Sequence, residues 1–156
     1  NKDVNKILEK RKRDFELYKK MTPPSIMTSD GEILTDKTGN NSTPEGALIG
    51  MAASAGIKEG TANVILELSD ADLKEGEILV TSCTDPAWTP LFTKASAVVT
   101  ETGGMMMHSS VTARECGIPA AAGVKDAVKK IKTGDRIRVN GTEGYVEILE
   151  AYKEEI

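Results

Sequence analysis

The chain has 156 residues, of which 39% are hydrophobic, 28% charged and 4% aromatic, and its formal net charge at pH 7 is −4. A chain of this length forms about one domain with a buried core. Its apolar runs are short and its first residues are charged, so we expect neither a membrane span nor a signal peptide. The two cysteines, Cys83 and Cys116, form no disulfide framework, which favours a cytoplasmic location.

Charge is distributed unevenly along the chain. Residues 1–20 contain eight Lys or Arg and four acidic residues, a net charge of +4, so the remainder carries −8. Basic helices occur in nucleic-acid-binding proteins. Here acidic residues are interspersed, no aromatic side chains are placed for base stacking, and the acidic remainder would repel phosphate backbones. We therefore expect no nucleic-acid partner.

The first 45 residues are predicted to form a helix and a linker. Residues 1–20 have a narrow helical stripe of apolar side chains, and Pro23-Pro24 ends it. Residues 25–45 are rich in Ser, Thr, Gly, Asn and Asp, as in a linker. The predicted organisation is therefore a helix and linker over 1–45, a compact domain over 46–150 and a charged tail over 151–156.

The compact domain is predicted to alternate strands and helices. Asp85-Pro86 marks one helix start, Gly117 one helix end, and Asn140-Gly141 a hairpin turn. Strands are expected over 48–56, 61–68, 77–82, 97–100, 119–122, 135–140 and 145–149, and helices over 86–94, 108–116 and 124–132. This order indicates a mixed α/β domain.

The only histidine, His108, follows Gly103-Gly104 and opens a predicted helix. The first amides of a helix lack intrahelical acceptors, and the helix dipole adds partial positive charge there. Such an end favours a neutral, nucleophilic imidazole and also a phosphorylated, anionic one. The glycines allow close approach of the backbone to phosphate, and the hydroxyls of Ser109 and Ser110 can donate to phosphoryl oxygens. The pattern therefore suits covalent phosphoryl transfer by His108.

Two other interpretations remain open. Met105–Met107 can act as flexible core filler with an apolar rim, or as the contact patch of a docking module that has lost phosphoryl transfer. The second interpretation of the chain is a thiol enzyme that uses Cys83 and His108. Cys116 lies about two helical turns after His108, too far for a catalytic pair. One histidine and two cysteines make no zinc site, and the sequence has no Gly-x-x-x-x-Gly-Lys loop for ATP.

A series of motifs over residues 48–149 resembles the swivelling phosphohistidine domain, or mobile domain, of the phosphoenolpyruvate-utilising enzymes. The resemblance is greatest to the phosphoenolpyruvate synthase and rifamycin phosphotransferase types. The matching segments are Ala53-Ser54-Ala55-Gly56, Glu59-Gly60, Ile78-Leu79-Val80-Thr81, Thr84-Asp85-Pro86-Ala87-Trp88-Thr89-Pro90-Leu91, Val98-Val99-Thr100-Glu101-Thr102-Gly103-Gly104, His108, Ala113-Arg114-Glu115, Gly117-Ile118-Pro119-Ala120, Gly123-Val124 and Gly134-Asp135-Arg136-Ile137-Arg138-Val139-Asn140-Gly141.

The resemblance implies a swivelling β/β/α domain with mixed sheets in an ATP-dependent phosphotransferase, incomplete as an enzyme by itself. It implies that His108 takes a phosphoryl group at an ATP-grasp domain and delivers it, at an acceptor-binding domain, to pyruvate, rifamycin or another small acceptor. Mg²⁺ and ATP are expected in those partner domains, and no cofactor or metal in this one. Phosphate-supporting residues would be Gly103, Gly104, Ser109, Ser110 and Arg114, although Arg114 suits a surface ion pair equally well. The sequence departs from the family pattern at Met106, Met107 and Thr112.

Overall fold

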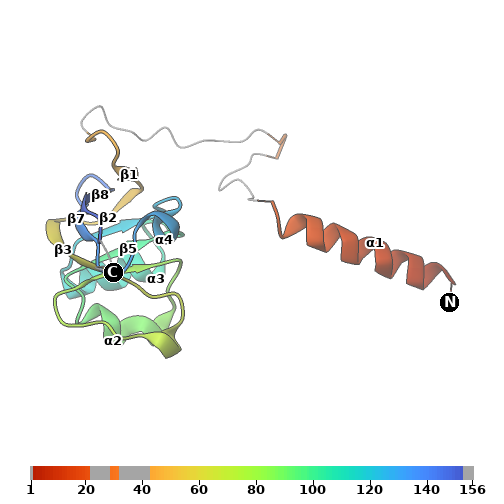
Figure 1. Ribbon diagram of the computed structural model, residues 1–156, viewed down its shortest axis with the longest axis horizontal. Coiled ribbons are helices and arrows are strands. Elements are labelled where there is room, and N and C mark those ends of the chain that lie inside the picture. Colours follow the sequence, from red (N-terminus) through yellow and green to blue (C-terminus); the bar gives the residue numbers. More distant parts are fainter. Residues whose placement is uncertain (1, 22–28, 32–42, 153–156) are drawn as a thin grey trace. The chain divides into compact units, whose positions relative to one another are not determined.

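The computed structural model describes residues 2–21, 29–31 and 43–152 (Figure 1). The chain divides into two units, Asn1–Lys37 and Thr38–Ile156. The first contains helix α1 (Lys2–Tyr18), which confirms the predicted N-terminal helix. The apolar side chains of this helix, such as Val4 and Phe15, are mostly exposed. The predicted linker lies largely outside the described residues. Within those residues, no helix has the length and hydropathy that crossing a bilayer demands.

The described residues of the second unit form eight strands in the order β1-β8-β7-β3-β4-β5-β6-β2. They are β1 (Leu48–Ile49), β2 (Met51–Ser54), β3 (Ile57–Val64), β4 (Ile78–Thr81), β5 (Ala97–Thr100), β6 (Ala120–Ala122), β7 (Arg136–Asn140) and β8 (Tyr145–Glu150). The pairs within β3-β4-β5-β6 are parallel, and the remaining pairs are antiparallel. The predicted mixed sheet is confirmed.

Strand β3 joins two halves of this sheet. Residues 57–61 pair antiparallel with β7, and residues 62–64 pair parallel with β4. The sequence-based range 61–68 was wrong at both ends. The segment 58–60 lacks apolar alternation, and its strand conformation comes from hydrogen bonds to β7, which lies far away along the chain. After Val64 the chain leaves the sheet and forms a short 3-10 turn, η1 (Leu68–Asp70).

The helical segments of the second unit are short. Besides η1, those that the structure describes are η2 (Pro86–Trp88), α2 (Thr89–Phe92), α3 (His108–Cys116) and α4 (Ala127–Lys130). The Asp85 carboxylate accepts a hydrogen bond from the Ala87 amide at 2.8 Å, so the predicted N-cap is confirmed. Gly117 ends α3 in the left-handed conformation with φ of 67°, as predicted for a helix C-terminus.

The helix predicted over 124–132 was too long. Its N-cap position, Asp126, has φ of 57°, and Ile131 is already extended. The reason is a tertiary hydrogen bond, since the Val124 amide donates to the Thr100 carbonyl at 2.9 Å and keeps the chain beside β5. Only the four residues of α4 remain helical.

Two apolar clusters lie on opposite sides of β4, β5 and β6, because successive strand side chains point to opposite faces. The first contains Leu79 and Val98 with Trp88, Leu91, Phe92 and Ala113 of the helical segments. The second contains Ile78, Val80, Ala97 and Val99 with Ile137, Val139 and Val146 of β7 and β8, and with Ala127 and Ile131. The unit therefore has a sheet–sheet–helix layering, which is the predicted β/β/α architecture.

The connection between β7 and β8 differs in detail from the predicted turn. Asn140 pairs with Tyr145, so four residues, 141–144, form the connection rather than a two-residue Asn-Gly turn. The Gly144 amide donates to the Asn140 carbonyl at 2.8 Å, and the left-handed residue is Gly144, with φ of 77°. The hairpin was predicted correctly, but the glycine with positive φ is Gly144 and not Gly141 of the predicted Asn-Gly turn.

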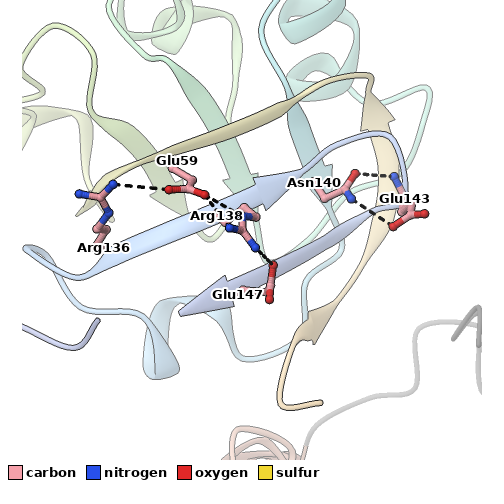
Figure 2. Close-up of polar contacts among 6 residues, drawn as sticks. All are labelled: Glu59, Arg136, Arg138, Asn140, Glu143 and Glu147. Carbon is pink, nitrogen blue, oxygen red and sulfur yellow. Dashed lines mark hydrogen bonds and ion pairs between the residues drawn. The ribbon is translucent and has the colours of Figure 1, made fainter. Parts of the chain in front are cut away.

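A cluster of ion pairs links β3, β7 and β8 (Figure 2). The Glu59 carboxylate accepts hydrogen bonds from Arg138 at 2.9 and 2.7 Å and from Arg136 at 3.4 Å, and Arg138 also donates to Glu147 at 3.0 Å. Glu59 and Glu147 stand directly opposite Arg138 on the two neighbouring strands. The hydrogen bond from Arg138 lowers the pKa of the Glu59 carboxyl below its ordinary value.

This cluster predicts how stability depends on pH. Because the pKa of Glu59 is lower in the folded state, its contribution is complete above the unfolded value of about 4.3 and is lost as the pH falls through the folded pKa. Glu59→Gln should therefore lower the free energy of unfolding at pH 7, and the difference from wild type should shrink toward pH 3. Urea denaturation across this range measures it, with the exposed Glu67→Gln as control. A difference that is constant with pH would contradict the assignment.

Candidate active site

His108 is the first residue of α3 and follows the loop that leaves β5, as the sequence predicted. Met107 precedes it in an extended conformation, with φ of −75° and ψ of 156°, and provides no side-chain cap. The side chain of His108 is half-buried. The first amides of α3 have no intrahelical acceptors, so the imidazole stands at a positively polarised helix end.

The two ring nitrogens of His108 have different surroundings. Nε2 lies 3.3 Å from the Thr112 hydroxyl oxygen, one helical turn further along α3. Nδ1 is buried and has no hydrogen-bond partner among the described residues. The Phe92 ring lies edge-on to the imidazole, with the centroids 6.3 Å apart and an interplanar angle of 83°. Nδ1 is therefore not among the atoms of the side chain that face solvent.

The contact between Thr112 and His108 can be tested directly. Thr112→Val removes the hydroxyl partner of Nε2, and we expect the free energy of unfolding to fall by about 1 kcal/mol, the usual net value of such a bond. The ¹⁵N shifts of the His108 ring should change in the same variant. Thr93→Val serves as control, because its hydroxyl donates only to the Pro90 carbonyl at an exposed site. Unchanged shifts together with unchanged stability would show that the contact is absent in solution.

The two glycines before the histidine are not equivalent. Gly103 has φ of 134°, a conformation that other residues rarely adopt, and an added Cβ would lie 3.4 Å from the Thr100 hydroxyl oxygen. Gly104 has no such backbone requirement, and an added Cβ would meet only the Met51 methyl group at 3.7 Å. The expected need for glycine therefore rests on Gly103.

The two serines of the first turn also differ. Both are buried, but the Ser110 hydroxyl donates to the Gly104 carbonyl at 2.7 Å. The Ser109 hydroxyl makes no hydrogen bond within the described part of the chain, and it lies 3.7 Å from the position of a Cβ added at Gly103. The loop before His108 therefore occupies the hydroxyl of Ser110 but not that of Ser109.

Arg114 is occupied by backbone carbonyl groups. Its Nη1 donates to the Ala53 carbonyl of β2 at 2.7 Å, and its Nη2 donates to the Met105 carbonyl of the loop, also at 2.7 Å. The three methionines of that loop are exposed, with Met106 at 90%. The interpretation of these methionines as core filler was therefore wrong.

Sequence reasoning missed two neighbours of the site. Thr100 is buried and its hydroxyl has no hydrogen-bond partner in the described part of the chain, and Phe92 contacts the imidazole from α2. Their sequence patterns indicated only a core strand and a helix. The spacing of four residues between His108 and Thr112 is the one signal that predicts a contact. Cys83 and Cys116 are both exposed, and neither is among the hydrogen-bond partners that the structure describes for His108.

Comparisons with known proteins agree with this architecture. Residues 73–144 match the family model described as the PEP-utilising enzyme mobile domain. The chain is 53% identical over 149 residues to a rifampicin phosphotransferase of Bacillus cereus, a match that covers 96% of this chain and 17% of that protein. It is 41% identical over 136 residues to a probable phosphoenolpyruvate synthase of Pyrococcus horikoshii, covering 86% of this chain and 16% of that protein. The chain thus spans about one sixth of the length of these relatives.

Among solved structures, the aconitase X of Thermococcus kodakaraensis is similar in fold. The TM-score is 0.53 at 22% identity, covering 67% of this chain and 98% of that one. At this identity the likeness concerns the fold alone. The family match within the β/β/α unit and the two relatives that align over most of the chain agree with each other. The chain therefore belongs to the mobile-domain family of the PEP-utilising enzymes.

Proposed function

We propose that residues 46–150 form a carrier domain in which His108 accepts a phosphoryl group and passes it on. The observation that carries this proposal is the position of the only histidine at the first turn of α3, in a chain whose relatives are named as phosphotransferases and phosphoenolpyruvate synthases. A nucleophile at this position reacts next to amides that stabilise an added phosphate.

The reaction consists of two transfers at one nitrogen. The lone pair of Nε2 attacks the γ-phosphorus of ATP, the N–P bond forms, and the P–O bond to the β-phosphate breaks with its electron pair on ADP. Attack at the β-phosphorus instead releases AMP and leaves a pyrophosphoryl group on Nε2, whose terminal phosphate is then cleaved by water as inorganic phosphate. The ring proton stays on Nδ1. The acceptor oxygen then attacks the same phosphorus, the N–P bond breaks and its electron pair returns to Nε2. The acceptor's proton passes to a base of the acceptor-binding domain.

Burial of Nδ1 supports Nε2 as the reacting nitrogen. In the resting state the Thr112 hydroxyl lies beside Nε2, so it must rotate away before the attack. Once phosphate is attached, the amides at the start of α3 and the Thr112 hydroxyl, which lies 3.3 Å from Nε2, can donate to its oxygens, and the Ser109 hydroxyl is a further candidate donor. The exposed loop that carries the methionines leaves room for a partner domain.

The proposal places ATP, Mg²⁺ and the acceptor in other domains of a longer polypeptide. An ATP-grasp domain would supply the phosphoryl group, and an acceptor-binding domain would receive it. Within the described residues, no group of three or more His, Cys, Asp or Glu side chains is arranged to hold a metal ion. The share of identical residues is higher for the rifampicin phosphotransferase than for the phosphoenolpyruvate synthase, which favours a hydroxyl of a rifamycin over pyruvate as acceptor.

The test is to label the complete polypeptide with [β-³²P]ATP and, separately, with [γ-³²P]ATP. We expect one of the two to leave a label that is stable to base and labile to acid, the behaviour of a phosphoramidate. Adding rifampicin or pyruvate should then discharge the label, and the acceptor that does so identifies the reaction. If neither nucleotide transfers label to the protein while both are consumed elsewhere, phosphoryl transfer by this domain is ruled out.

A second candidate is a docking module without phosphoryl transfer. It is favoured by the exposure of Met105, Met106 and Met107, at 59%, 90% and 52%, because contiguous apolar side chains on a surface often contact a partner. One comparison of variants distinguishes the docking module from the phosphoryl carrier. A docking module keeps its partner affinity in His108→Ala and loses it in Met106→Asp, and the native protein contains no phosphohistidine.

A further inference from the structure

The loop before His108 is attached to α3 by two side chains of that helix. Ser110 donates from its hydroxyl to the Gly104 carbonyl, and Arg114 donates from Nη2 to the Met105 carbonyl, each at 2.7 Å. The two side chains are four residues apart and therefore lie on the same face of α3. They hold the carbonyl groups of two successive loop residues.

The same guanidinium group also reaches the neighbouring strand. Its Nη1 donates to the Ala53 carbonyl of β2 at 2.7 Å. A guanidinium is planar and presents its donors in a rigid fork, so the positions of the two carbonyl groups are set relative to each other. Arg114 thus connects α3, β2 and the loop, whereas a single ammonium group cannot reproduce this spacing.

These contacts determine the orientation of the loop peptides. Because a peptide group is planar and trans, its N–H points opposite to its carbonyl. With the Gly104 and Met105 carbonyls turned to their donors on α3, the amides of Met105 and Met106 point away from them, and neither donates a hydrogen bond in the described part of the chain. The Gly104 carbonyl also accepts from the Met107 amide at 3.0 Å, which closes a turn directly before His108.

We propose that Ser110 and Arg114 are positioning residues, which fix the backbone of residues 104–107 and thereby the place where His108 enters α3. Arg114 acts on phosphoryl transfer through the Met105 and Ala53 carbonyls and not by contact with the phosphate. The catalytic part of this inference rests on the proposed function. The structural part, a rigid loop that depends on two side chains, does not.

The experiment compares Arg114→Lys, Arg114→Gln and Ser110→Ala with wild type, and it uses Arg136→Lys as matched control. Arg136 is an exposed arginine paired with Glu59, on β7. The first measurement is the ¹⁵N order parameter of residues 103–107 in the 156-residue chain. We expect wild-type values near about 0.85, as for rigid backbone, and values below about 0.6 in both Arg114 variants. The control variant should resemble wild type.

The second measurement is the rate of His108 phosphorylation in the complete polypeptide. A misplaced loop should lower the rate by about tenfold to a hundredfold in both Arg114 variants, while the KM for ATP stays within about twofold. Lysine keeps the positive charge of arginine but not its planar fork of donors. If Arg114 bound the phosphate, Arg114→Lys would keep the wild-type rate, whereas if Arg114 positions the loop, Arg114→Lys should lose it. The double variant Ser110→Ala/Arg114→Gln should lose less than the product of the two single effects, because both side chains hold one loop.

Three results would overturn the proposal: a loop that is already flexible in wild type, order parameters that do not change in the variants, or an Arg114→Lys variant with wild-type rate. The last would assign Arg114 to the phosphate. If wild type forms no phosphohistidine at all, the proposed function fails, but the order parameters still decide whether Arg114 and Ser110 hold the loop.

Discussion

His108→Gln should reduce the base-stable, acid-labile label on the complete polypeptide by at least about a thousandfold. Glutamine keeps a polar side chain of similar length beside Phe92, but its amide nitrogen has no lone pair available for attack on phosphorus. The sequence contains no second histidine, so no other side chain of this chain could form a phosphohistidine. The label is measured after transfer from ATP, by gel autoradiography with acid and base treatment.

The matched control is Cys116→Ser, which changes an exposed residue at the far end of the same helix. It should keep full labelling. Thermal unfolding of His108→Gln should remain close to wild type, so that lost labelling reports lost chemistry and not lost folding. Label that persists in His108→Gln with the stability of a phosphoramidate would mean that the phosphoryl group is not on this histidine.

Gly144→Ala should lower the free energy of unfolding by about 3 kcal/mol and the melting temperature by about 10 °C. Gly144 has φ of 77°, a conformation that costs an L-residue about 1–2 kcal/mol. An added Cβ would also lie against the backbone nitrogen of Ala52 and 2.5 Å from the carbonyl carbon of Met51. Backbone atoms of β2 cannot move aside as a flexible side chain can, so the clash adds to the conformational strain.

Gly76→Ala separates the conformational strain of a positive φ from the clash with the backbone of β2. Gly76 has φ of 86°, but an added Cβ meets nothing within 4 Å, so only the strain of about 1 kcal/mol is expected. Chemical denaturation of both variants measures the difference. Equal destabilisation would show that the close approach of the hairpin to β2 is not tight in solution.

The effect of Gly144→Ala should also extend to the active site. Residues 51 and 52 belong to β2, and the next residue, Ala53, supplies one of the carbonyl groups that Arg114 holds. A shift of β2 would therefore disturb the loop before His108, and the order parameters of residues 103–107 should fall in this variant but not in Gly76→Ala.

Local signals in the sequence predicted much of the fold. The strand over 97–100 and the helix over 108–116 were placed at their observed bounds, and the Asp85 cap and the Gly117 end were identified. These features depend on neighbours in the chain, such as a capping side chain or a glycine with positive φ. The motifs around His108 were sufficient to identify the family, because they consist of particular residue types in a fixed order.

What the sequence could not predict depends on contacts between distant segments. Strand β3 begins at Ile57 because β7 pairs with it, and the helix after Val124 is short because that residue's amide donates to Thr100. The roles of Ser110 and Arg114 could not be deduced either, since their partners are carbonyl groups, which every residue possesses and no sequence pattern marks.

By itself, the sequence determined the family, the order of most strands and helices, and a lone imidazole at a helix start, because each follows from residue type and local spacing. The tertiary structure alone decided which ring nitrogen of His108 is buried, which serine hydroxyl holds the loop and which carbonyl groups Arg114 binds. Those properties depend on how β2, α3 and the loop after β5 pack together. The contacts in this packing are made largely to backbone carbonyl groups, and because every residue has such a group, the residue types along the chain do not predict them.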